Sequence, residues 1–520
     1  MGPSPHSSSQ FLRHASLAAL LCLLAACGTL PPLEPRSQSH AYTDTAGTRL
    51  GRVITPMAAA HPGQSGIHPL LDARDAFAAR VHLAQTAERS LDVQYYIWHK
   101  DMTGTLLFDA LRAATERGVR VRLLLDDNNT GGLDATLAAL GSHPGIEVRL
   151  FNPLMARNWR WLNYLTDFSR ANRRMHNKSF TADNQVTIIG GRNVGDEYFG
   201  ATSGVLFSDL DVIAVGAVVQ SVSDDFDLYW RSASAYPAQR LLAPAAPGAL
   251  AMLAAEAAQL RQEEATSEYT QAVRASSFVQ ELTAARLPLE WAVTRMVSDD
   301  PAKALGKAEP SALLPQQLKA LIGDPVSRVS LVSPYFVPSE SVELFSELAD
   351  RGVAVDILTN SLEATDVAAV HAGYAKHREP LLEAGVKLYE LKRLAPRPAG
   401  KREGAMHGSS SATSLHAKTF SVDRSRLFVG SFNFDPRSAR LNTEIGFVID
   451  SPALAGQLDD AFIQRIPDSA YQVHLGEDGR LFWTEQRDGQ TVVHDAEPGA
   501  SLWQRFSVWL LSLLPIDSLL

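Results

Sequence analysis

The chain has 520 residues, of which 45% are hydrophobic and 20% are charged, and its formal net charge is −9. This composition is normal for a globular protein with a large core, and no charged block is long enough to form a disordered tail. The acidic balance argues against a nucleic-acid-binding protein, although a local basic patch can override it. The length predicts two or more domains, or one large duplicated domain.

The first residues have the pattern of a secretory signal. Arg13 precedes an apolar run from Ala15 to Ala26, which is too short to span a membrane. The residues before Cys27 resemble a bacterial lipoprotein cleavage site, at which the cysteine is lipidated and becomes the mature N-terminus. We therefore predict a membrane-anchored lipoprotein of the cell envelope that faces the periplasm, in a leaflet left open. A plain secretory signal or an uncleaved anchor is the alternative. Cys22 and Cys27 are the two cysteines, so the exported protein has no disulfide.

Strands and helices alternate after a tether rich in proline, serine and threonine. A helix is predicted around Phe77, Val81 and Ala84, which share one face. The segment 90–98 follows as a β-rich run, and 103–119 has the apolar spacing of a helix that ends at a glycine. Two further strands are predicted at 120–127 and 145–154. This order favours an α/β fold with parallel strands.

The same order recurs later, at 328–339, 340–353, 354–361 and 385–392, which indicates an internal duplication. The predicted organisation is a signal peptide (1–26), a tether (27–66), a first half (67–235), a helical connection (236–325), a second half (326–470) and a C-terminal hairpin with an apolar tail (471–520).

Two copies of one motif carry the strongest signal. MHNKSFTADNQVTIIGGRN ends at Asn193, and LHAKTFSVDRSRLFVGSFN ends at Asn433. Six residues recur with a constant offset of 240: His176, Lys178, Phe180, Asp183, Gly190 and Asn193 match His416, Lys418, Phe420, Asp423, Gly430 and Asn433. Tyr95 and Tyr335 have the same offset. A repeat kept only for folding is the alternative interpretation.

Local geometry favours a functional site. Residues two apart on a strand point to the same face, so His176 and Lys178 are expected to project together, as are His416 and Lys418. Asp183 and its neighbour are predicted to form the turn of a hairpin. If the two halves pack about a pseudo-two-fold axis, the two pairs meet in one cleft.

Such a cleft suits phosphodiester chemistry. Two lysines and two asparagine amides can bind phosphoryl oxygens and stabilise charge that develops on them. One imidazole can attack phosphorus, and the other can protonate the leaving oxygen and then deprotonate the incoming group. Lysine as the repeated partner favours phosphate over zinc or magnesium. No metal and no cofactor are expected.

The repeated His-x-Lys-x4-Asp motif resembles the signature of the phospholipase D superfamily. The resemblance implies a duplicated α/β/α sandwich whose halves share one active-site cleft, and a phosphohistidine intermediate formed without metal. It implies catalytic roles for His176, Lys178, Asp183, His416, Lys418 and Asp423, and phosphate binding by Asn193 and Asn433.

In that superfamily an acidic residue on a following strand orients each histidine. The pattern points to Glu444 in the second half. In the first half it points to Asp209, with Asp211 as a competing choice. By analogy, His176 is expected to be the nucleophile and His416 the general acid and base, although the near symmetry allows the reverse.

A longer resemblance extends over nearly the whole mature chain. The segments HPGQSG, LDVQYYIW, TDFSRANRRMHNKSF and GSFNFDPRS are similar to those of the C-type bacterial cardiolipin synthases. This implies transfer of a phosphatidyl group to the headgroup alcohol of another phospholipid, so that cardiolipin is made from phosphatidylglycerol and a second phospholipid, which is expected to be phosphatidylethanolamine. The expected partners are therefore phospholipid substrates, a membrane surface and a possible helper protein, without nucleic acid.

Two segments outside the motifs suit a lipid substrate. Residues 157–174 interleave arginines with aromatic residues, which is typical of an anionic membrane interface, of a single-stranded nucleic-acid site or of an ordinary surface. Residues 501–520 are apolar but too short to span, so they either lie in the interface or dock on the domain as a last helix.

Three hypotheses stand at this point: a phosphatidyltransferase that makes cardiolipin, a phospholipase D-type hydrolase, and a non-catalytic membrane scaffold. Intact His–Lys pairs in both halves argue against the scaffold. The same catalytic residues serve a transferase and a hydrolase, so they do not separate the first two hypotheses.

Overall fold

The structure is a computed structural model, and it describes residues 30–202, 205–339, 341–393, 412–515 and 517–520. The predicted signal peptide and Cys27 lie outside the described residues, so lipidation stays a prediction.

The first half contains the alternating elements that the sequence predicts. Helix α3 (Ala73–Thr86) precedes strand β2 (Ser90–Ile97), and α4 (Met102–Glu116) connects β2 to β3 (Arg120–Asn129). Strand β3 pairs in parallel with β2 and with β4 (Ile146–Phe151). The prediction of parallel strands is confirmed here.

The second half repeats this arrangement. Strand β11 (Arg328–Val332) leads through α14 (Val342–Asp350) to β12 (Ala354–Asn360), and β12 pairs in parallel with β11 and with β13 (Lys387–Leu391). In both halves the first parallel strand also pairs antiparallel with the strand that follows the His-x-Lys motif. The duplication is therefore present in the fold as well as in the sequence.

The offset of 240 residues between the two motif copies does not extend to strands β2 and β11. Leu91 lies opposite Ala182, whereas Val329 lies opposite Val422. The strands β2 and β11 are thus offset by two residues relative to the motif, and Tyr95 corresponds to Ser333 rather than to Tyr335. The match between Tyr95 and Tyr335 is a coincidence of numbering.

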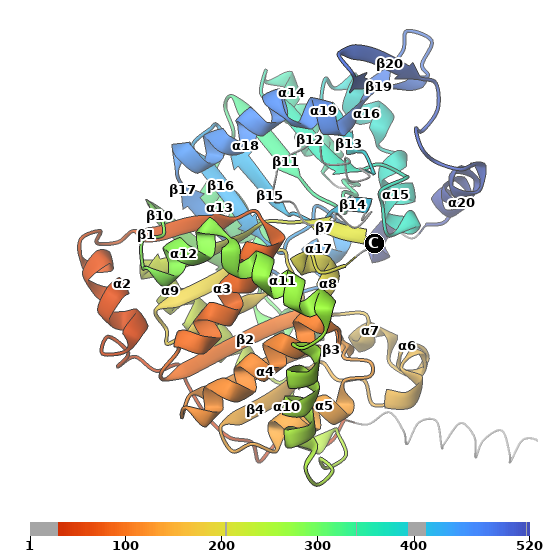
Figure 1. The fold of residues 1–520 in the computed structure, drawn as a ribbon. Helices are drawn as coiled ribbons and strands as arrows, with labels where there is room; N and C mark the ends of the chain where they lie inside the picture. The colour runs from red at the N-terminus through yellow and green to blue at the C-terminus, as the bar shows by residue number, and fades with distance from the viewer. Residues whose placement is uncertain (1–29, 203–204, 340, 394–411, 516) are drawn as a thin grey trace, which may run out of the picture.

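A continuous path of strand pairs links the two halves (Figure 1). It runs β9-β4-β3-β2-β5-β6-β8-β1-β10-β17-β16-β15-β11-β12-β13-β18-β19-β20. The remaining strands on this path are β1 (Ser65–Leu70), β5 (Ser179–Ala182), β6 (Val186–Gly190), β8 (Asp211–Gly216), β9 (Ala235–Pro237), β10 (Glu290–Ser298), β15 (Thr419–Val422), β16 (Arg426–Gly430), β17 (Ile445–Asp450), β18 (Ala470–Leu475), β19 (Leu481–Arg487) and β20 (Gln490–His494). Strands β7 (Val205–Ser208) and β14 (Ala412–Leu415) form a separate parallel pair across the halves.

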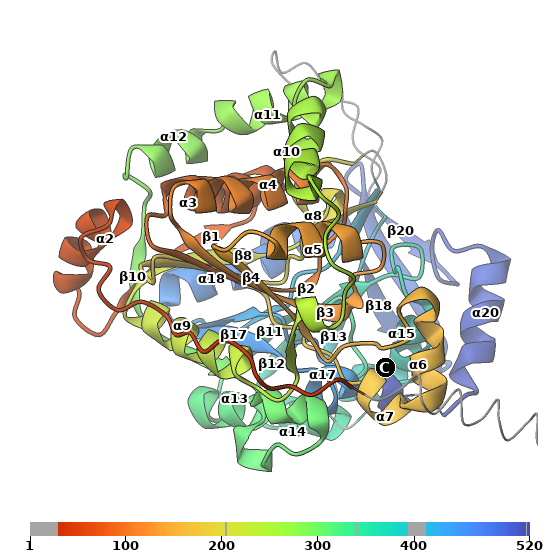
Figure 2. The same cartoon turned by 90° about the horizontal axis from the view of Figure 1, so that it is seen from below.

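Helices cover both faces of the sheets, as expected for an α/β/α sandwich (Figure 2). Those not yet introduced are α2 (Arg49–Ala59), α5 (Asp134–Gly141), α6 (Trp161–Thr166), α7 (Phe168–Ala171), α8 (Asp196–Phe199), α9 (Ala217–Trp230), α10 (Ala249–Leu260), α11 (Glu264–Ala275), α12 (Ser277–Thr283), α13 (Leu314–Ile322), α15 (Ala368–Ala375), α16 (Arg378–Glu383), α17 (Pro436–Arg440), α18 (Pro452–Gln464), α19 (Ile466–Ser469) and α20 (Leu502–Ser512). None of the helices in the described part of the chain has the length and apolarity needed to cross a membrane.

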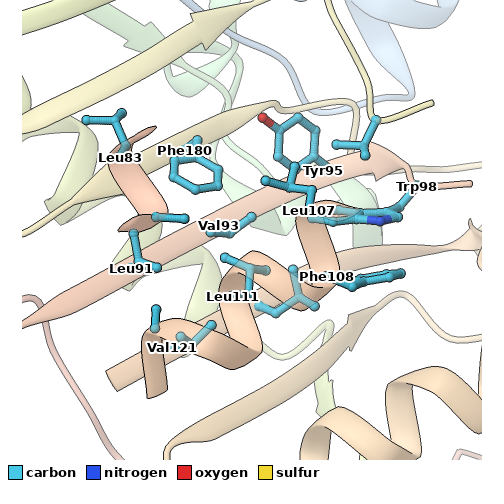
Figure 3. Close-up of a cluster of buried hydrophobic side chains, with 14 of the residues drawn as sticks. Leu83, Leu91, Val93, Tyr95, Trp98, Leu107, Phe108, Leu111, Val121 and Phe180 are labelled. Carbon is cyan, nitrogen blue, oxygen red and sulfur yellow. The ribbon is translucent and has the colours of Figure 1, made fainter. Parts of the chain in front are cut away.

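Each half has its own apolar core. In the first half, Leu107 and Leu111 of α4 pack on β2, beside Phe180 of β5 (Figure 3). The ring of Phe108 stacks on that of Trp98 with 4.3 Å between centroids. A further buried cluster joins Ile189 on β6 to residues of β16 and β17, so apolar packing as well as strand pairing connects the halves.

Two predicted domain assignments change. The N-terminal segment contacts the first half and is therefore not a free tether. Arg36 donates a hydrogen bond to the carbonyl of Ser232. The guanidinium of Arg120 lies over the ring of Tyr42, 4.0 Å from the ring centroid. Helix α2 also belongs to this segment. The connection between the halves is not purely helical, since β10 pairs with β1 of the first half and β17 of the second. The predicted C-terminal hairpin is confirmed as β19 and β20.

Candidate active site

Reciprocal backbone pairing between the halves places the two motif histidines. The N–H of His176 donates to the carbonyl of Thr443 (2.8 Å), and the N–H of His416 donates to the carbonyl of Ser208 (2.8 Å). Each histidine therefore enters the site beside a strand segment of the opposite half. The next residue along that segment is an acid, Glu444 in one case and Asp209 in the other.

Each imidazole bonds to that acid across the interface. Nδ1 of His176 lies 2.8 Å from Oε2 of Glu444, and Nδ1 of His416 lies 2.5 Å from Oδ2 of Asp209. All four side chains are buried. The contact fixes each ring and leaves Nε2 as the nitrogen available for chemistry.

The structure thus selects Asp209 over Asp211. The carboxylate of Asp211 bonds instead to Arg80 (2.7 Å), which holds it in the core. The sequence pattern indicates Glu444, and Asp209 or Asp211, as the acid for the histidine of the same half, whereas Glu444 contacts His176 and Asp209 contacts His416. The structure exchanges the partners.

Small residues make room for these acids. A Cβ atom added to Gly191 would lie 2.2 Å from Oδ1 of Asp209. The second half has Ser431 at the matching motif position, and its hydroxyl donates to the carboxylate of Glu444. The two acid–histidine pairs are therefore similar in position but different in chemistry.

The lysines lie beside the histidines that precede them. Both ammonium groups donate to the backbone carbonyl of the motif histidine, and Nζ of Lys418 is also 3.0 Å from Nδ1 of His416. Burial lowers the pKa of Lys178 well below its usual value and lowers that of Lys418 to about 8. Both lysine side chains are buried. Glu444 favours the charged form of Lys178, and Asp209 favours that of Lys418, through electrostatic attraction. An anion bound between them would restore the stability of the charged form.

The two acid–histidine pairs differ in their electrostatics. Burial, Lys178 and Lys418 lower the pKa of His176 well below its usual value, and burial raises the pKa of Glu444 to about 7. Burial lowers the pKa of His416 as well. Burial alone would raise the pKa of Asp209, but His416 and Lys418 hold it below its usual value. At neutral pH, Asp209 is a carboxylate, whereas Glu444 is partly protonated.

The two motif aspartates lie outside this group. The carboxylate of Asp183 accepts hydrogen bonds from the backbone N–H groups of Glu88, Arg89 and Ser90, at the start of β2. Asp423 accepts equivalent bonds from Val326, Ser327 and Arg328, at the start of β11.

Both aspartates adopt positive φ values, 52° and 53°, in the predicted hairpin turns. Their contacts explain the conserved spacing within the repeat by folding alone, since each carboxylate fixes the start of a central strand. This geometry disagrees with the predicted catalytic role of Asp183 and Asp423.

The two motif asparagines are not equivalent. Oδ1 of Asn193 accepts from the N–H of Ile97 (3.1 Å), and its Nδ2 donates to the hydroxyl of Tyr198 (3.1 Å). In contrast, Oδ1 of Asn433 is buried without a hydrogen-bond partner among the described residues. The amide of Asn433 is therefore the one left to respond to a bound group.

Aromatic side chains that the motif does not reveal surround the imidazoles. The ring of Tyr96 meets His176 edge-on at 4.9 Å, and Tyr198 meets His416 in the same way at 5.2 Å. Phe207 contacts His416 at 5.0 Å. Tyr96 adjoins Tyr95, but only strand register decides which of the two faces the site. Tyr198 and Phe207 have no counterpart in the repeat, so no sequence signal marked them.

A group with metal-ligand spacing occurs elsewhere in the described part of the chain: His99, Asp101 and Glu197. Nδ1 of His99 lies 3.0 Å from Glu197, while Asp101 accepts from the N–H groups of Gly104 and Asp196. Asp101 therefore has a capping role at α4 already. These residues are separate from the two His–Lys pairs.

Fold and site together define a phospholipase D-like protein, in which two halves each contribute a His–Lys pair to one buried interface. The family model described as "Cardiolipin synthase, PLD-like domain" matches residues 81–230 and 318–466. The chain is 51% identical to "Cardiolipin synthase C" of Escherichia coli over 91% of this chain and 100% of that one. It therefore belongs to the cardiolipin synthase family of the phospholipase D superfamily, and it is an enzyme of the phosphatidyltransferase type.

More distant relatives agree with this assignment. The chain is 25% identical to "Cardiolipin synthase A" of Pseudomonas entomophila over 82% of this chain and 74% of that one. Among solved structures, the phosphatidylserine synthase of Haemophilus influenzae aligns with a TM-score of 0.54 and 14% identity, covering 90% of this chain and all of that one. At that identity the likeness concerns the fold alone.

Proposed function

We propose that this protein makes cardiolipin by transferring a phosphatidyl group from phosphatidylethanolamine to the glycerol headgroup of phosphatidylglycerol through a phosphohistidine on His176. The observation that carries the proposal is the 51% identity over the whole of E. coli cardiolipin synthase C, in a chain that keeps both acid-supported His–Lys pairs. The chemistry follows from the positions of these side chains.

In the first step, neutral Nε2 of His176 attacks the phosphorus of phosphatidylethanolamine while the bond from phosphorus to the ethanolamine oxygen breaks. His416 gives its proton to that oxygen, so ethanolamine leaves as an alcohol. In the second step, His416 takes the proton of the incoming headgroup alcohol, whose oxygen displaces His176 from phosphorus. Lys178 and Lys418 stabilise the negative charge on the phosphoryl oxygens in both steps.

The asymmetry of the two pairs supports this assignment of roles. A nucleophilic imidazole must be neutral, and His176 has its pKa lowered well below the usual value, next to an acid that retains its proton to about pH 7. A general acid must carry a proton, and the ionised Asp209 stabilises the imidazolium form of His416.

The pH dependence of kcat/KM is expected to fall in two steps on the alkaline side. The first step comes from His416, because the general acid must carry a proton and burial and Lys418 lower its pKa below the usual value. The second step lies near pH 8, where Lys418 loses its proton and the neutral amine no longer stabilises phosphoryl charge. The rate is expected to persist below pH 6.5, because His176 stays neutral there. Initial rates on mixed lipid–detergent micelles between pH 5 and 10 measure these steps. Lys418→Arg is expected to move the step near pH 8 upward; an unmoved step contradicts its assignment to Lys418.

Product analysis tests the proposed reaction. Vesicles that contain phosphatidylglycerol and phosphatidylethanolamine are expected to yield cardiolipin, with phosphatidic acid as a minor product, because the burial of both histidines limits access of water. Mass spectrometry of the extracted lipids measures the ratio. Phosphatidic acid as the main product, with any helper protein present, would make the protein a phospholipase D-type hydrolase. Omitting phosphatidylethanolamine tests the identity of the phosphatidyl donor.

Exposed apolar residues suggest how the enzyme meets its lipids. On α20, Trp503 is 77% exposed and Trp509 is 57% exposed; near α6, Trp159 and Trp161 are 66% and 61% exposed. Both views place α6, α7 and α20 on one side of the molecule, with the C-terminus between them (Figures 1 and 2). We propose that this side lies in the membrane interface, where tryptophan is favoured.

The arginines of the 157–174 segment contribute less to such a surface than the sequence indicated. Arg157 pairs with Asp127 and Asp134, and Arg170 pairs with Asp167. These contacts direct the charges toward the protein and leave the aromatic rings exposed. The surface that this segment presents to the membrane is therefore mainly apolar.

Cys27→Ala is expected to release the protein from membranes or to block its maturation. The reason is the lipoprotein-type sequence before Cys27, which makes this thiol the acceptor of the lipid anchor. Palmitate labelling and fractionation of cells measure the effect. Cys22→Ala, in the predicted signal, serves as the control and leaves labelling unchanged. Palmitate incorporation that persists in Cys27→Ala would contradict the anchoring prediction.

A further inference from the structure

The second half contains an apolar cavity of about 520 Å³ between α13 and α14, on the outer face of its sheet. Leu318 and Ile322 of α13 line one wall, and Phe345 and Leu348 of α14 line the other, while β11 and β15 form the floor. The volume lies within the range of roughly 300–1,000 Å³ that is usual for ligand sites. Charged side chains also line the cavity, among them Lys319, Glu347 and Arg351, so they accompany its apolar floor and walls.

The corresponding space in the first half is filled by the chain itself. Helices α3 and α4 pack directly on each other, and α11 and α12 lie over α3 (Figure 2). Tyr269 of α11 meets Phe77 of α3 with 5.7 Å between ring centroids, and Phe278 of α12 joins the same buried cluster. In Figure 2, α13 and α14 lie at the outer edge with no such cover. Among the described residues, the space between α13 and α14 therefore lacks the kind of cover that α11 and α12 give to α3.

One end of the cavity adjoins the candidate active site. Phe432 and Phe434, which line the cavity, flank Asn433, the motif residue whose amide oxygen has no partner. The next lining residue, Asp435, is buried and lies close enough to Lys418 to affect it electrostatically. A long apolar ligand in the cavity would thus begin beside the His–Lys pairs and extend along β11 away from them.

We propose that this cavity binds an acyl chain of the phospholipid whose phosphodiester lies between the two His–Lys pairs. The inference rests on the proposed function for the identity of the headgroup, but the apolar walls and their continuity with the site select the ligand class. Each methylene removed from water contributes about a fourfold change in affinity, so several carbons in the cavity produce selectivity for long chains.

Photocrosslinking tests directly where the acyl chain of the phospholipid binds. The full-length protein is illuminated with phosphatidylethanolamine that carries a diazirine near the end of one acyl chain, and labelled peptides are identified by mass spectrometry. Labels on α13, α14 and β11 are expected. Labels confined to α6, α7 and α20 would place the acyl chains in the bilayer and overturn the proposal.

A charge at the cavity wall provides a second measurement. Leu344 lines the cavity on α14 and is 49% exposed, so Leu344→Glu is compatible with folding. We expect kcat/KM for dioleoyl phosphatidylethanolamine to fall about tenfold and that for the dihexanoyl lipid to stay unchanged, because short chains bury few methylenes. Met252→Glu, at a 69% exposed position on α10, is the matched control and changes neither value.

Equal losses on both lipids, or no loss on the long one, would contradict acyl binding in the cavity. Failure of the proposed function has a different outcome: the wild-type protein then makes no cardiolipin from either lipid, while crosslinking still reports whether an acyl chain occupies the space between α13 and α14.

Discussion

His176→Ala and His416→Ala are each expected to lower turnover by at least roughly a thousandfold. The first substitution removes the proposed nucleophile, and the second removes the group that protonates the leaving alcohol. The halves meet at one interface, so neither pair can compensate for the other. Cardiolipin formed per minute by purified, folded protein is the measurement. The double variant is expected to lose little more than either single variant, because the two imidazoles act in one reaction.

Asp183→Asn is the matched control within the same motif. Its carboxylate binds the backbone at the start of β2 rather than an imidazole. We expect this variant to unfold at a lower temperature but to keep near-normal turnover in its folded fraction. A loss as large as that of His176→Ala, without a change in melting temperature, would restore the catalytic role that the motif implied. Near-normal activity in either histidine variant would rule out the shared-site mechanism.

Glu444→Gln and Asp209→Asn are expected to cost on the order of a hundredfold to ten-thousandfold in kcat, because an amide fails to hold the productive tautomer of the ring. The affected histidine differs between the two variants. Glu444 contacts His176 at 2.8 Å, and Asp209 contacts His416 at 2.5 Å. The partner in each case belongs to the opposite half of the chain.

Nitrogen NMR of protein with labelled histidines tests whether each acid contacts the histidine of the opposite half. This measurement does not rely on activity. Glu444→Gln is expected to change the ring signals of His176 and to leave those of His416 in place, and Asp209→Asn is expected to do the reverse. Each variant therefore serves as the control for the other. The opposite assignment, with Glu444 acting on His416, would mean that each half orients its own histidine.

Much of the fold could be predicted because local signals and the repeat agreed. The helix around Phe77, the helix around Leu107 and the strands beside them follow from apolar spacing, and all appear in the structure. The segment before α3 was misjudged because its composition is that of a linker, whereas Arg36 and Tyr42 bind residues far away in sequence. Strand β10 was missed for a related reason, since its partners lie in both halves.

The sequence by itself determined most of the residues that form the site: two histidines, two lysines and Glu444, with Asp209 or Asp211 as the second acid. It did so because the motif occurs twice with identical spacing, and strand geometry makes alternate residues share a face. Tertiary structure decided which acid meets which histidine. Parallel pairing of one half's segment with the other brings Thr443 beside His176 and Ser208 beside His416, and no local pattern encodes a contact between residues more than 200 positions apart. The same pairing separates the motif aspartates from the imidazoles, because the two ends of a short strand face opposite edges of the sheet.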